Sequence, residues 1–481
     1  MTTLTDVAAT PAATHRMTSR QRLVLVLLLG VQFMLAIDFS ILNVALPVVG
    51  EGLGFGLDSL QWIATAFALP AAGFTLLFGR VADLFGRRRM LLAGMALLAV
   101  GSLLGGLATS PALLLTGRVL QGLATAIATP AALSLITTSF TEGPLRNRAL
   151  GLSGALMSAG FTTGAVLGGV LTDLLSWRWA FLINVPIAVF VLVVAPLVIT
   201  EARSATGAAR GGRLDVPGAI TVTGGLLALV YGITAAGERG WSDPFALGAL
   251  VLAAVLLAAF WFAERRAPAP LVPLRVLAKR TVTWGNVGGF IAFATETSLV
   301  FLMTLYLQQV LGFSALATGL ALGVLGAGTF AGGVAAPRIM TRLGGRWTLA
   351  AGLALQAVAT ATLLGLGTSR DGLALMLIAT AVGGFGNLVA IVAFMGIATS
   401  GLPDHEQGLA TGLATMTQQV AITLGIPVMS AVLTAAHGGG ILGGIHAATA
   451  VNAALTLTGA VLAAVFLRRP ATTGATPGAE D

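Results

Sequence analysis

Of 481 residues, 56% are hydrophobic and 9% are charged, which excludes an ordinary soluble domain, where about 25% of residues carry a charge. The net charge of +8 comes from basic residues in short segments between apolar runs, so it does not indicate a nucleic-acid partner. The chain has no cysteine, which excludes disulfides, thiolate metal sites and a cysteine nucleophile. The composition therefore predicts an all-α integral membrane protein.

Fourteen apolar runs are long enough to cross a bilayer, which takes about 20 residues. All of them are predicted to be helices, because lipid offers no hydrogen-bond partner to an unpaired backbone group. The expected spans are 23–48, 60–79, 90–108, 112–136, 149–172, 179–199, 216–236, 244–263, 283–307, 316–337, 347–367, 372–398, 408–434 and 446–467.

The basic residues set the direction of these spans. With the N-terminus in the cytoplasm and sides alternating, 22 of the 26 basic residues fall on the cytoplasmic side, three on the other side and one, Arg118, inside a span. Basic residues accumulate in the cytoplasmic loops of membrane proteins. We therefore expect both termini in the cytoplasm, and the first apolar run is read as a retained span rather than a signal peptide.

A repeat relates the two halves of the chain. An offset of 258 positions superposes segment 79–89 on segment 337–347 and carries Asp38 to Glu296. Two six-helix halves of the same orientation are therefore expected, with an inserted pair of helices between them. The expected parts are a cytoplasmic tail (1–22), an N-terminal bundle (23–199), the inserted pair with its flanking loops (200–281), a C-terminal bundle (282–467) and a cytoplasmic tail (468–481).

Three charged residues lie inside expected spans: Asp38, Arg118 and Glu296. A charge in hydrocarbon costs about 2.5–3.5 kcal/mol on insertion scales, so each is a candidate functional residue. At about 1.5 Å per residue, all three come to a similar depth in the outer half, where they can line one cavity and Asp38 can pair with Arg118. Burial favours a neutral carboxyl group and a nearby arginine favours its charged form, so alternating surroundings can load and release a proton. The alternative is a set of static buried charges that serve packing or insertion.

Polar residues on two expected spans predict the wall of a substrate cavity. Gln32 and Asn43 share a face of span 23–48, and Asn286, Thr304 and Gln308 fall on one side of span 283–307 and its end. The alternative use of these residues is hydrogen bonding between helices.

Other chemistry leaves no trace in the sequence. The single lysine, Lys279, follows Ala278, so there is no Gly-Lys-Ser/Thr motif for nucleotide hydrolysis, and the four histidines lack metal-ligand spacing. Gly160, Gly164 and Gly168 recur every fourth residue, which lets a neighbouring backbone approach closely. From spacing alone, static packing is the expected role of these glycines. We expect no metal and no cofactor.

These motifs resemble the major facilitator superfamily, specifically its fourteen-span drug:proton antiporters. The resemblance rests on IDFSILNVALP (37–47), GRVADLFGRRR (79–89), GRVLQG (117–122), the glycine motif at 160–169 and WRWAFLINVPI (177–187). At Ala165 the family pattern has a proline, so the bend of this span departs from the family.

The resemblance implies a major facilitator fold, with two six-helix bundles that rock around a central site and an inserted helix pair. It implies proton coupling by Asp38 and Arg118, to which the repeat adds Glu296 as the second candidate acid. It implies an antiporter motif of Gly160, Gly164, Gly168 and Gly169. It implies a cytoplasmic gating loop that latches the bundles, made of Gly79, Arg80, Asp83, Gly86, Arg87 and Arg88. The alternative for the loop arginines is that they only fix the orientation of the helices in the membrane.

The expected function is proton-coupled export of amphipathic, cationic or aromatic drugs across the bacterial cell membrane, without enzymatic activity. The expected energy source is the proton gradient, and the expected partners are a drug-like substrate, protons and lipid, with the chain as a monomer. One alternative is an exporter of the same fold dedicated to a single natural product, lipid or siderophore. A second alternative is a non-transporting membrane enzyme or sensor.

Overall fold

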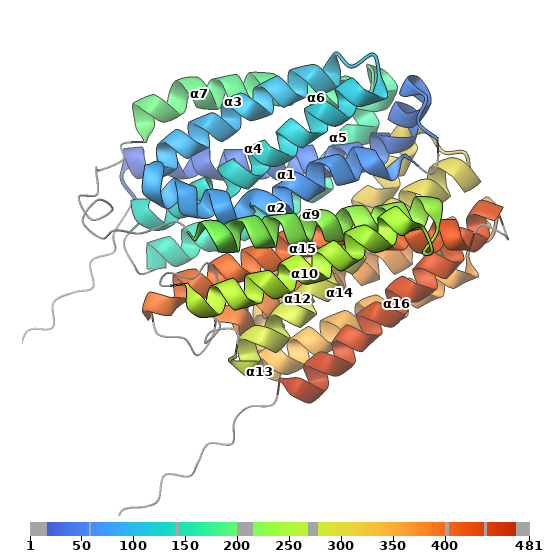
Figure 1. The fold of residues 1–481 in the computed structure, drawn as a ribbon. Coiled ribbons are helices and arrows are strands. Elements are labelled where there is room, and N and C mark those ends of the chain that lie inside the picture. Colours follow the sequence, from blue (N-terminus) through green and yellow to red (C-terminus); the bar gives the residue numbers. More distant parts are fainter. Residues whose placement is uncertain are drawn as a thin grey trace, which may run out of the picture.

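The computed structural model describes residues 17–56, 59–140, 144–199, 215–267, 278–399, 404–436 and 440–467, which form helices and no strand (Figure 1). The N-terminal half contains α1 (Ser19–Leu53), α2 (Gln61–Phe85), α3 (Arg87–Gly106), α4 (Pro111–Ser139), α5 (Pro144–Leu174), α6 (Trp179–Leu182) and α7 (Asn184–Val198). The rest contains α9 (Val216–Arg239), α10 (Pro244–Arg266), α12 (Arg280–Leu305), the π-helical turn η1 (Tyr306–Val310), α13 (Ala315–Thr362), α14 (Leu373–Thr399), α15 (Asp404–Ala435) and α16 (Gly440–Phe466). Short 3₁₀ turns, η2 (Leu363–Gly365) and η3 (Arg370–Gly372), lie between α13 and α14.

Among the described residues, eleven helical segments are long and apolar enough to cross a membrane. One of them is built on α13, whose 48 residues contain the expected span 316–337 and most of the span 347–367, on either side of a kink at Gly344. The helices α2 and α5 coincide with two further expected spans but are not among the eleven. The all-helical membrane fold is confirmed, whereas the count of fourteen spans and the division into parts stay predictions.

The loop expected at 80–89 is almost entirely helical, which corrects the sequence prediction. α2 ends at Phe85 and α3 begins at Arg87, so Gly86 alone, at φ +103°, turns the chain. Gly344 turns the chain in the same way inside α13, at φ +75°. Glycine adopts such positive φ values more readily than other residues because it has no Cβ atom. Arginines end an apolar run but do not end a helix, because a helix can continue beyond the hydrocarbon layer.

Repeat-related arginines tether the last helix of each half. Nη2 of Arg88 donates a hydrogen bond to the carbonyl oxygen of Pro196 near the end of α7, at 3.0 Å. Nε of Arg346, 258 positions later, donates to the carbonyl oxygen of Ala464 near the end of α16, at 2.9 Å. Both contacts satisfy carbonyl groups that a helix C-terminus leaves unpaired. The sequence repeat therefore reflects a shared tertiary contact.

Buried clusters join the halves at one end and, nearer the middle, through Phe39, Phe67 and Ile422. One cluster contains residues from both halves, including Leu46 of α1 and Leu305 of α12, at the end far from the termini. Two other clusters, represented by Leu28 and Phe394, each belong to one half and lie toward the end where α1 starts and α16 stops. By the predicted topology, the protein is closed on the outer side.

Direct contacts between the halves support this closure. Nε2 of Gln308 donates to the carbonyl oxygen of Val44 at 2.8 Å. A Cβ atom on Gly169 of α5 would lie 2.5 Å from the carbonyl oxygen of Ala315 on α13. Nearer the middle, Oγ1 of Thr423 on α15 donates to the carbonyl oxygen of Ala68 on α2, at 2.9 Å. These three contacts must change if the halves are to separate on the outer side.

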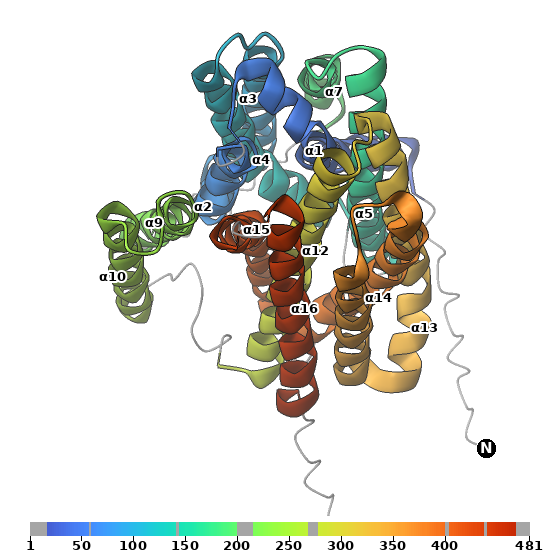
Figure 2. The ribbon, with the colours of Figure 1, turned by 90° about the vertical axis from the view of Figure 1, so that its right-hand side faces the viewer.

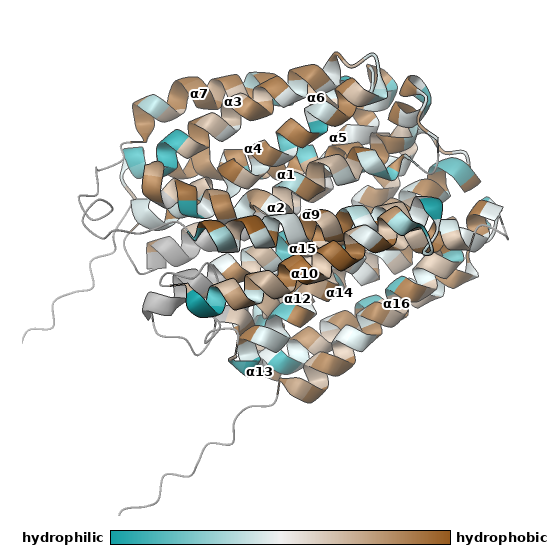
Figure 3. Ribbon diagram, in the orientation of Figure 1, coloured by the Kyte–Doolittle hydropathy of each residue, from teal (hydrophilic) through white to brown (hydrophobic). Residues whose placement is uncertain are grey.

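The inserted helices lie beside the seam between α2 and α15 (Figure 2). Oγ1 of Thr223 on α9 donates to the carbonyl oxygen of Gly73 on α2 at 2.6 Å, and a Cβ atom on Gly237 of α9 would lie 2.9 Å from Ala431 of α15. α10 packs on α9, and its long apolar side chains, such as Phe245 and Phe262, are exposed. Hydrophobic residues predominate along α7 and α10 in Figure 3, as expected of helix faces that contact lipid.

The repeated glycines of α5 pack directly on α1. A Cβ atom on Gly160, Gly164 or Gly168 would lie less than 3.0 Å from atoms of α1, and at Gly168 the nearest atom is the carbonyl oxygen of Ile41. Oγ of Ser40 also donates to a carbonyl oxygen of α5 at 2.6 Å. The packing role predicted from spacing is therefore confirmed.

We expect Gly168→Ala to destabilise the protein, because its new methyl group would overlap the backbone of α1. Overpacking of this kind typically costs about 1–3 kcal/mol, which thermal unfolding in detergent would register as a lower melting temperature. Gly30→Ala on α1 is the matched control, since a Cβ atom there meets nothing within 4 Å. Equal melting temperatures for the two variants would show that the α1–α5 contact is looser than described.

Candidate site for proton and substrate

A buried carboxylate on α1 is held by amides from two other helices. Asp38 is 0% exposed, and its Oδ1 accepts hydrogen bonds from the side-chain amides of Gln121 on α4, at 2.8 Å, and Asn184 on α7. Both amides also donate to the hydroxyl oxygen of Ser102 on α3, at 2.9 and 3.3 Å. Four helices of the N-terminal half therefore meet at this carboxyl group.

Arg118 lies beside the other oxygen of the same carboxylate. Its Nη1 is 3.8 Å from Oδ2 of Asp38, close enough for an ion pair but too far for a hydrogen bond. Its Nε donates instead to the carbonyl oxygen of Ile63 on α2 at 3.0 Å, and its Nη1 donates to Oε1 of Gln121 at 2.9 Å. Oδ2 of Asp38 consequently has no hydrogen-bond partner among the described residues, which leaves one oxygen free to carry a proton.

An aromatic ring covers the guanidinium group of Arg118. Its Cζ lies 4.3 Å from the ring centroid of Phe67 on α2, a cation–π contact. The centroid of Phe67 is in turn 5.7 Å from that of Phe39, and Phe39 is 5.5 Å from Phe161 on α5. The charged network therefore ends at an aromatic cluster.

Glu296 on α12 is the less compensated of the two acids. Both of its carboxyl oxygens are buried and lack a hydrogen-bond partner among the described residues. The same half has a buried polar network that is neutral and does not include Glu296: Asn387 contacts Gln356 at 3.2 Å, and Asn452 contacts Ser298 at 3.0 Å. Asp38 therefore has a basic partner in Arg118, whereas no described basic residue forms an ion pair with Glu296.

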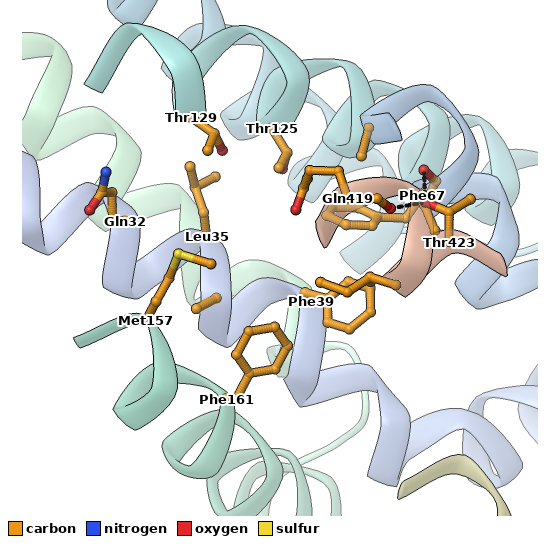
Figure 4. A pocket seen from close by; sticks show the side chains of 14 residues that line it. Gln32, Leu35, Phe39, Phe67, Thr125, Thr129, Met157, Phe161, Gln419 and Thr423 are labelled. Carbon is orange, nitrogen blue, oxygen red and sulfur yellow. Dashed lines mark hydrogen bonds between the residues drawn. The ribbon is translucent and has the colours of Figure 1, made fainter. Parts of the chain in front are cut away.

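A small cavity lies where the aromatic cluster meets α15 (Figure 4). Its volume is about 50 Å³, room for a few water molecules but not for a drug. Met157 and Phe161 form one side, Thr125 and Thr129 another, and Gln419 closes it from the C-terminal half. None of its lining residues is charged, so the cavity offers aromatic faces, a thioether, hydroxyl groups and amides. The remaining lining residues are Gln32, Leu35, Ala36, Phe39, Phe67, Ala68, Ala71, Ile422 and Thr423.

The expectation that the three buried charges line one cavity is not met here. Asp38 and Arg118 come together between α1, α2, α4 and α7, and neither they nor Glu296 line the described cavity. The estimate of depth was insufficient, because a helix at the correct depth can still direct a side chain to any side. The roles of the three residues in transport stay predictions.

Of the residues predicted to form the substrate cavity, Gln32 alone lines it in this structure. The others form helix contacts: Gln308 donates to α1 across the halves, and the amide oxygen of Asn286 accepts from Thr417 on α15 at 2.7 Å. Oγ1 of Thr304 donates to a carbonyl oxygen of its own helix, and Asn43 is buried. Gln308 and Asn286 thus make the contacts between helices that were the alternative, and the cavity role of all four residues stays a prediction.

The predicted gating residues lie at the junction of α2 and α3 and just before it. Gly79 and Arg80 belong to α2, and Arg88 bonds within its own half rather than across to the other half. The side chain of Asp83 lies outside the described residues. A latch between the halves therefore stays a prediction.

Sequence reasoning missed the partners of Asp38 and the aromatic cluster. Gln121 and Asn184 lie inside GRVLQG and WRWAFLINVPI, so polar residues in those motifs were a usable signal. Phe39, Phe67 and Phe161 carried no such signal, because the chain has 22 phenylalanines and most serve apolar packing or face lipid.

Two helical halves that close around a central cavity from one side define a membrane transporter rather than an enzyme. The model of the Major Facilitator Superfamily matches residues 28–426 and 287–481. The chain belongs to that superfamily, which confirms the resemblance seen in the sequence.

Several relatives are named for antibiotics. The chain is 40% identical over 304 residues to a cephamycin export protein of Amycolatopsis lactamdurans, covering 63% of this chain and 62% of that protein. It is 35% identical over 442 residues to a puromycin resistance protein of Streptomyces alboniger, covering 90% and 86%. It is 30% identical over 326 residues to a tetracenomycin C resistance and export protein of Streptomyces glaucescens, covering 68% and 60%.

Solved structures share the fold at low sequence identity. A crystal structure of an auto-inhibited peptide transporter of the POT family has a TM-score of 0.66 at 17% identity, covering 95% of this chain and 99% of that one. The human organic anion transporter MFSD10 has a TM-score of 0.62 at 20% identity, covering 93% and 100%. At these identities the likeness concerns the fold alone.

Proposed function

We propose that the chain is a proton-coupled exporter of amphipathic, aromatic drugs in the bacterial cell membrane. The observation that carries the proposal is the carboxyl group of Asp38, which is fully buried, bonded through one oxygen and open at the other, beside Arg118. Such a group is costly to keep charged without a full set of partners, so binding and losing a proton changes the energy of the conformation that holds it. The names of the relatives support a drug as cargo.

The cavity supports an aromatic cargo more than a cationic one. Three phenylalanines and a methionine offer apolar and aromatic contacts, while Gln32 and Gln419 can hydrogen-bond polar groups. A carboxylate would be the natural partner of a cation, yet the lining contains none. The cationic class expected from the sequence would have to rely on the faces of the aromatic rings.

The energy source in this proposal is the proton gradient, without metal or cofactor, and one chain is sufficient. A proton that moves down a potential of 100 mV supplies about 2.3 kcal/mol. In the described state the outer end is closed, so substrate would enter from the cytoplasm once the halves part. Loss of the proton on substrate entry would then favour the opposite closure, and protonation from the outer side would drive the return to the described state, which is alternating access.

The test is transport by the purified chain in proteoliposomes. An imposed pH gradient should concentrate ethidium, a planar aromatic dye, inside the vesicles, and a protonophore should abolish the accumulation. We expect Glu296→Gln to reduce this accumulation strongly, because the variant removes an acid whose two oxygens are unpaired. The variant should fold, since no described hydrogen bond to the carboxyl group is lost.

Gradient-driven transport that survives in both Glu296→Gln and Asp38→Asn would overturn proton coupling by these acids. Transport that persists in only one variant would assign the proton to the other acid. Vesicles that never accumulate dye or antibiotic under any gradient would overturn the function itself.

An exporter dedicated to one natural product is the second candidate, because relatives are named for single antibiotics. A panel of structurally unrelated dyes and antibiotics separates the two. Transport of one compound class alone would favour the dedicated exporter, and transport of many would favour the multidrug function.

A further inference from the structure

We propose that Phe67 is the residue that transmits substrate binding from the cavity to the proton site, an inference that rests on the proposed function. Phe67 belongs to both places at once: it lines the cavity, and its ring lies 4.3 Å from the guanidinium carbon of Arg118. It is a positioning residue, because it acts on Asp38 only through Arg118.

The backbone around Phe67 is fixed, so the ring is the part that can respond. A Cβ atom on Gly122 of α4 would overlap the carbonyl oxygen of Phe67, which means that α2 and α4 are in close backbone contact there. One turn earlier on α2, the carbonyl oxygen of Ile63 holds Nε of Arg118 at 3.0 Å. With both anchors on the same helix pair, a tilt of the ring changes the environment of the guanidinium without moving a helix.

Arg118 has a short path toward Asp38. Its Nη1 is 3.8 Å from Oδ2 of Asp38 and donates a hydrogen bond to Oε1 of Gln121. A shift of about 1 Å would bring Nη1 within hydrogen-bond distance of Oδ2, where it favours the charged form of the carboxyl group. The ring of Phe67 attracts the guanidinium toward α2 and so opposes that shift.

These contacts give the direction of coupling. An aromatic substrate in the cavity competes with Arg118 for the ring of Phe67, because a ring that tilts to pack on the substrate no longer presents its face to the guanidinium. Arg118 then moves toward Asp38 and stabilises the carboxylate. The proton leaves Oδ2 for cytoplasmic water, and the charged carboxylate stays beside the guanidinium. Substrate entry therefore expels the proton, as an antiporter requires.

Phe161 provides a matched control from the same cavity. It lines the cavity and contacts Phe39, with ring centroids 5.5 Å apart, as Phe67 does at 5.7 Å. Among the described residues, no cation lies over its ring. A purely structural or substrate-binding role predicts similar behaviour for the two phenylalanines, whereas the proposal predicts a difference.

The experiment measures dye binding and proton release separately on the full chain in detergent. Ethidium fluorescence gives the Kd, and a pH indicator in weakly buffered solution gives the protons released at saturating ethidium. We expect Phe67→Leu and Phe161→Leu each to weaken binding by about 2- to 10-fold, the range for loss of an aromatic pair. At saturation, Phe161→Leu should release protons like the wild type, and Phe67→Leu should fall to the level of Asp38→Asn.

Phe67→Tyr keeps the ring over the guanidinium and should retain proton release. This variant distinguishes transmission through Phe67 from a general loss of packing. Full proton release by Phe67→Leu at saturation would overturn the inference, and so would equal losses in the two leucine variants. Absence of ethidium binding by the wild-type chain would instead overturn the proposed aromatic site, and the relay with it.

Discussion

Replacing Asp38 with asparagine is expected to reduce gradient-driven ethidium transport to the level of empty vesicles, while ethidium–ethidium exchange without a gradient continues. Asparagine has nearly the same size, and its amide oxygen can still accept from Gln121 and Asn184. The position it changes, Oδ2, makes no hydrogen bond, but Arg118 loses its ion-pair partner, so the variant should be less stable and transport is compared at equal amounts of folded protein. What disappears is the one group in this network that can take up a proton. Transport into proteoliposomes with and without an imposed pH gradient measures the difference.

Asp371→Asn is the control for this variant. Asp371 is exposed in the turn before α14 and bonds to the hydroxyl of Ser369 at 3.0 Å, so its loss should leave both kinds of transport unchanged. Gradient-driven accumulation at wild-type levels in Asp38→Asn would contradict the expectation and leave Glu296 as the acid to consider. A loss of exchange together with accumulation would show that Asp38 serves binding as well as coupling.

Replacing Arg118 with methionine is expected to destabilise the protein more than any other single change in this network. Removing one partner of a buried ion pair typically costs about 3–5 kcal/mol, because the remaining charge is left without compensation. Methionine has similar length, so the effect of an empty cavity is kept small. Thermal unfolding in detergent should show a clearly lower melting temperature.

The double variant, Arg118→Met with Asp38→Asn, isolates the charge effect. Both the single and the double variant lose the hydrogen bonds that Arg118 gives to Ile63 and Gln121, so these losses cancel in the comparison. Removing both charges together is far less costly than removing one, so the double variant should recover part of the stability. A double variant no more stable than the single one would mean that Arg118 stabilises through packing and hydrogen bonds alone.

Much of the architecture followed from patterns along the chain. Apolar run length predicted the helices, basic residues predicted their direction, and an offset of 258 residues predicted a repeat that appears as the matched tethers of Arg88 and Arg346. These features depend on lipid and on local sequence, both of which act on each segment separately. The predicted loop at 80–89 failed for the same reason, because the pattern marks the edge of the hydrocarbon rather than the end of the helix.

The pairing of Asp38 with Arg118 could also be anticipated, since two opposite charges at similar depth are costly to keep apart. The surroundings of that pair were decided by the tertiary structure. Gln121, Asn184 and Ser102 come from three helices, and their convergence on one carboxyl group depends on how each helix is rotated about its axis. Rotation is set by packing against neighbours, which no single segment encodes.

By itself, the sequence determined a polytopic membrane protein with buried charges on its first, fourth and ninth expected spans, because burying a charge in lipid leaves a visible anomaly in an apolar run. Only the tertiary structure decided that Asp38 and Arg118 stand behind the cavity rather than in its wall, and that Phe67 lies between the cavity and Arg118. An aromatic side chain is ordinary in any membrane span. Its function here comes from what lies on its two sides, and that is a property of the packed helices.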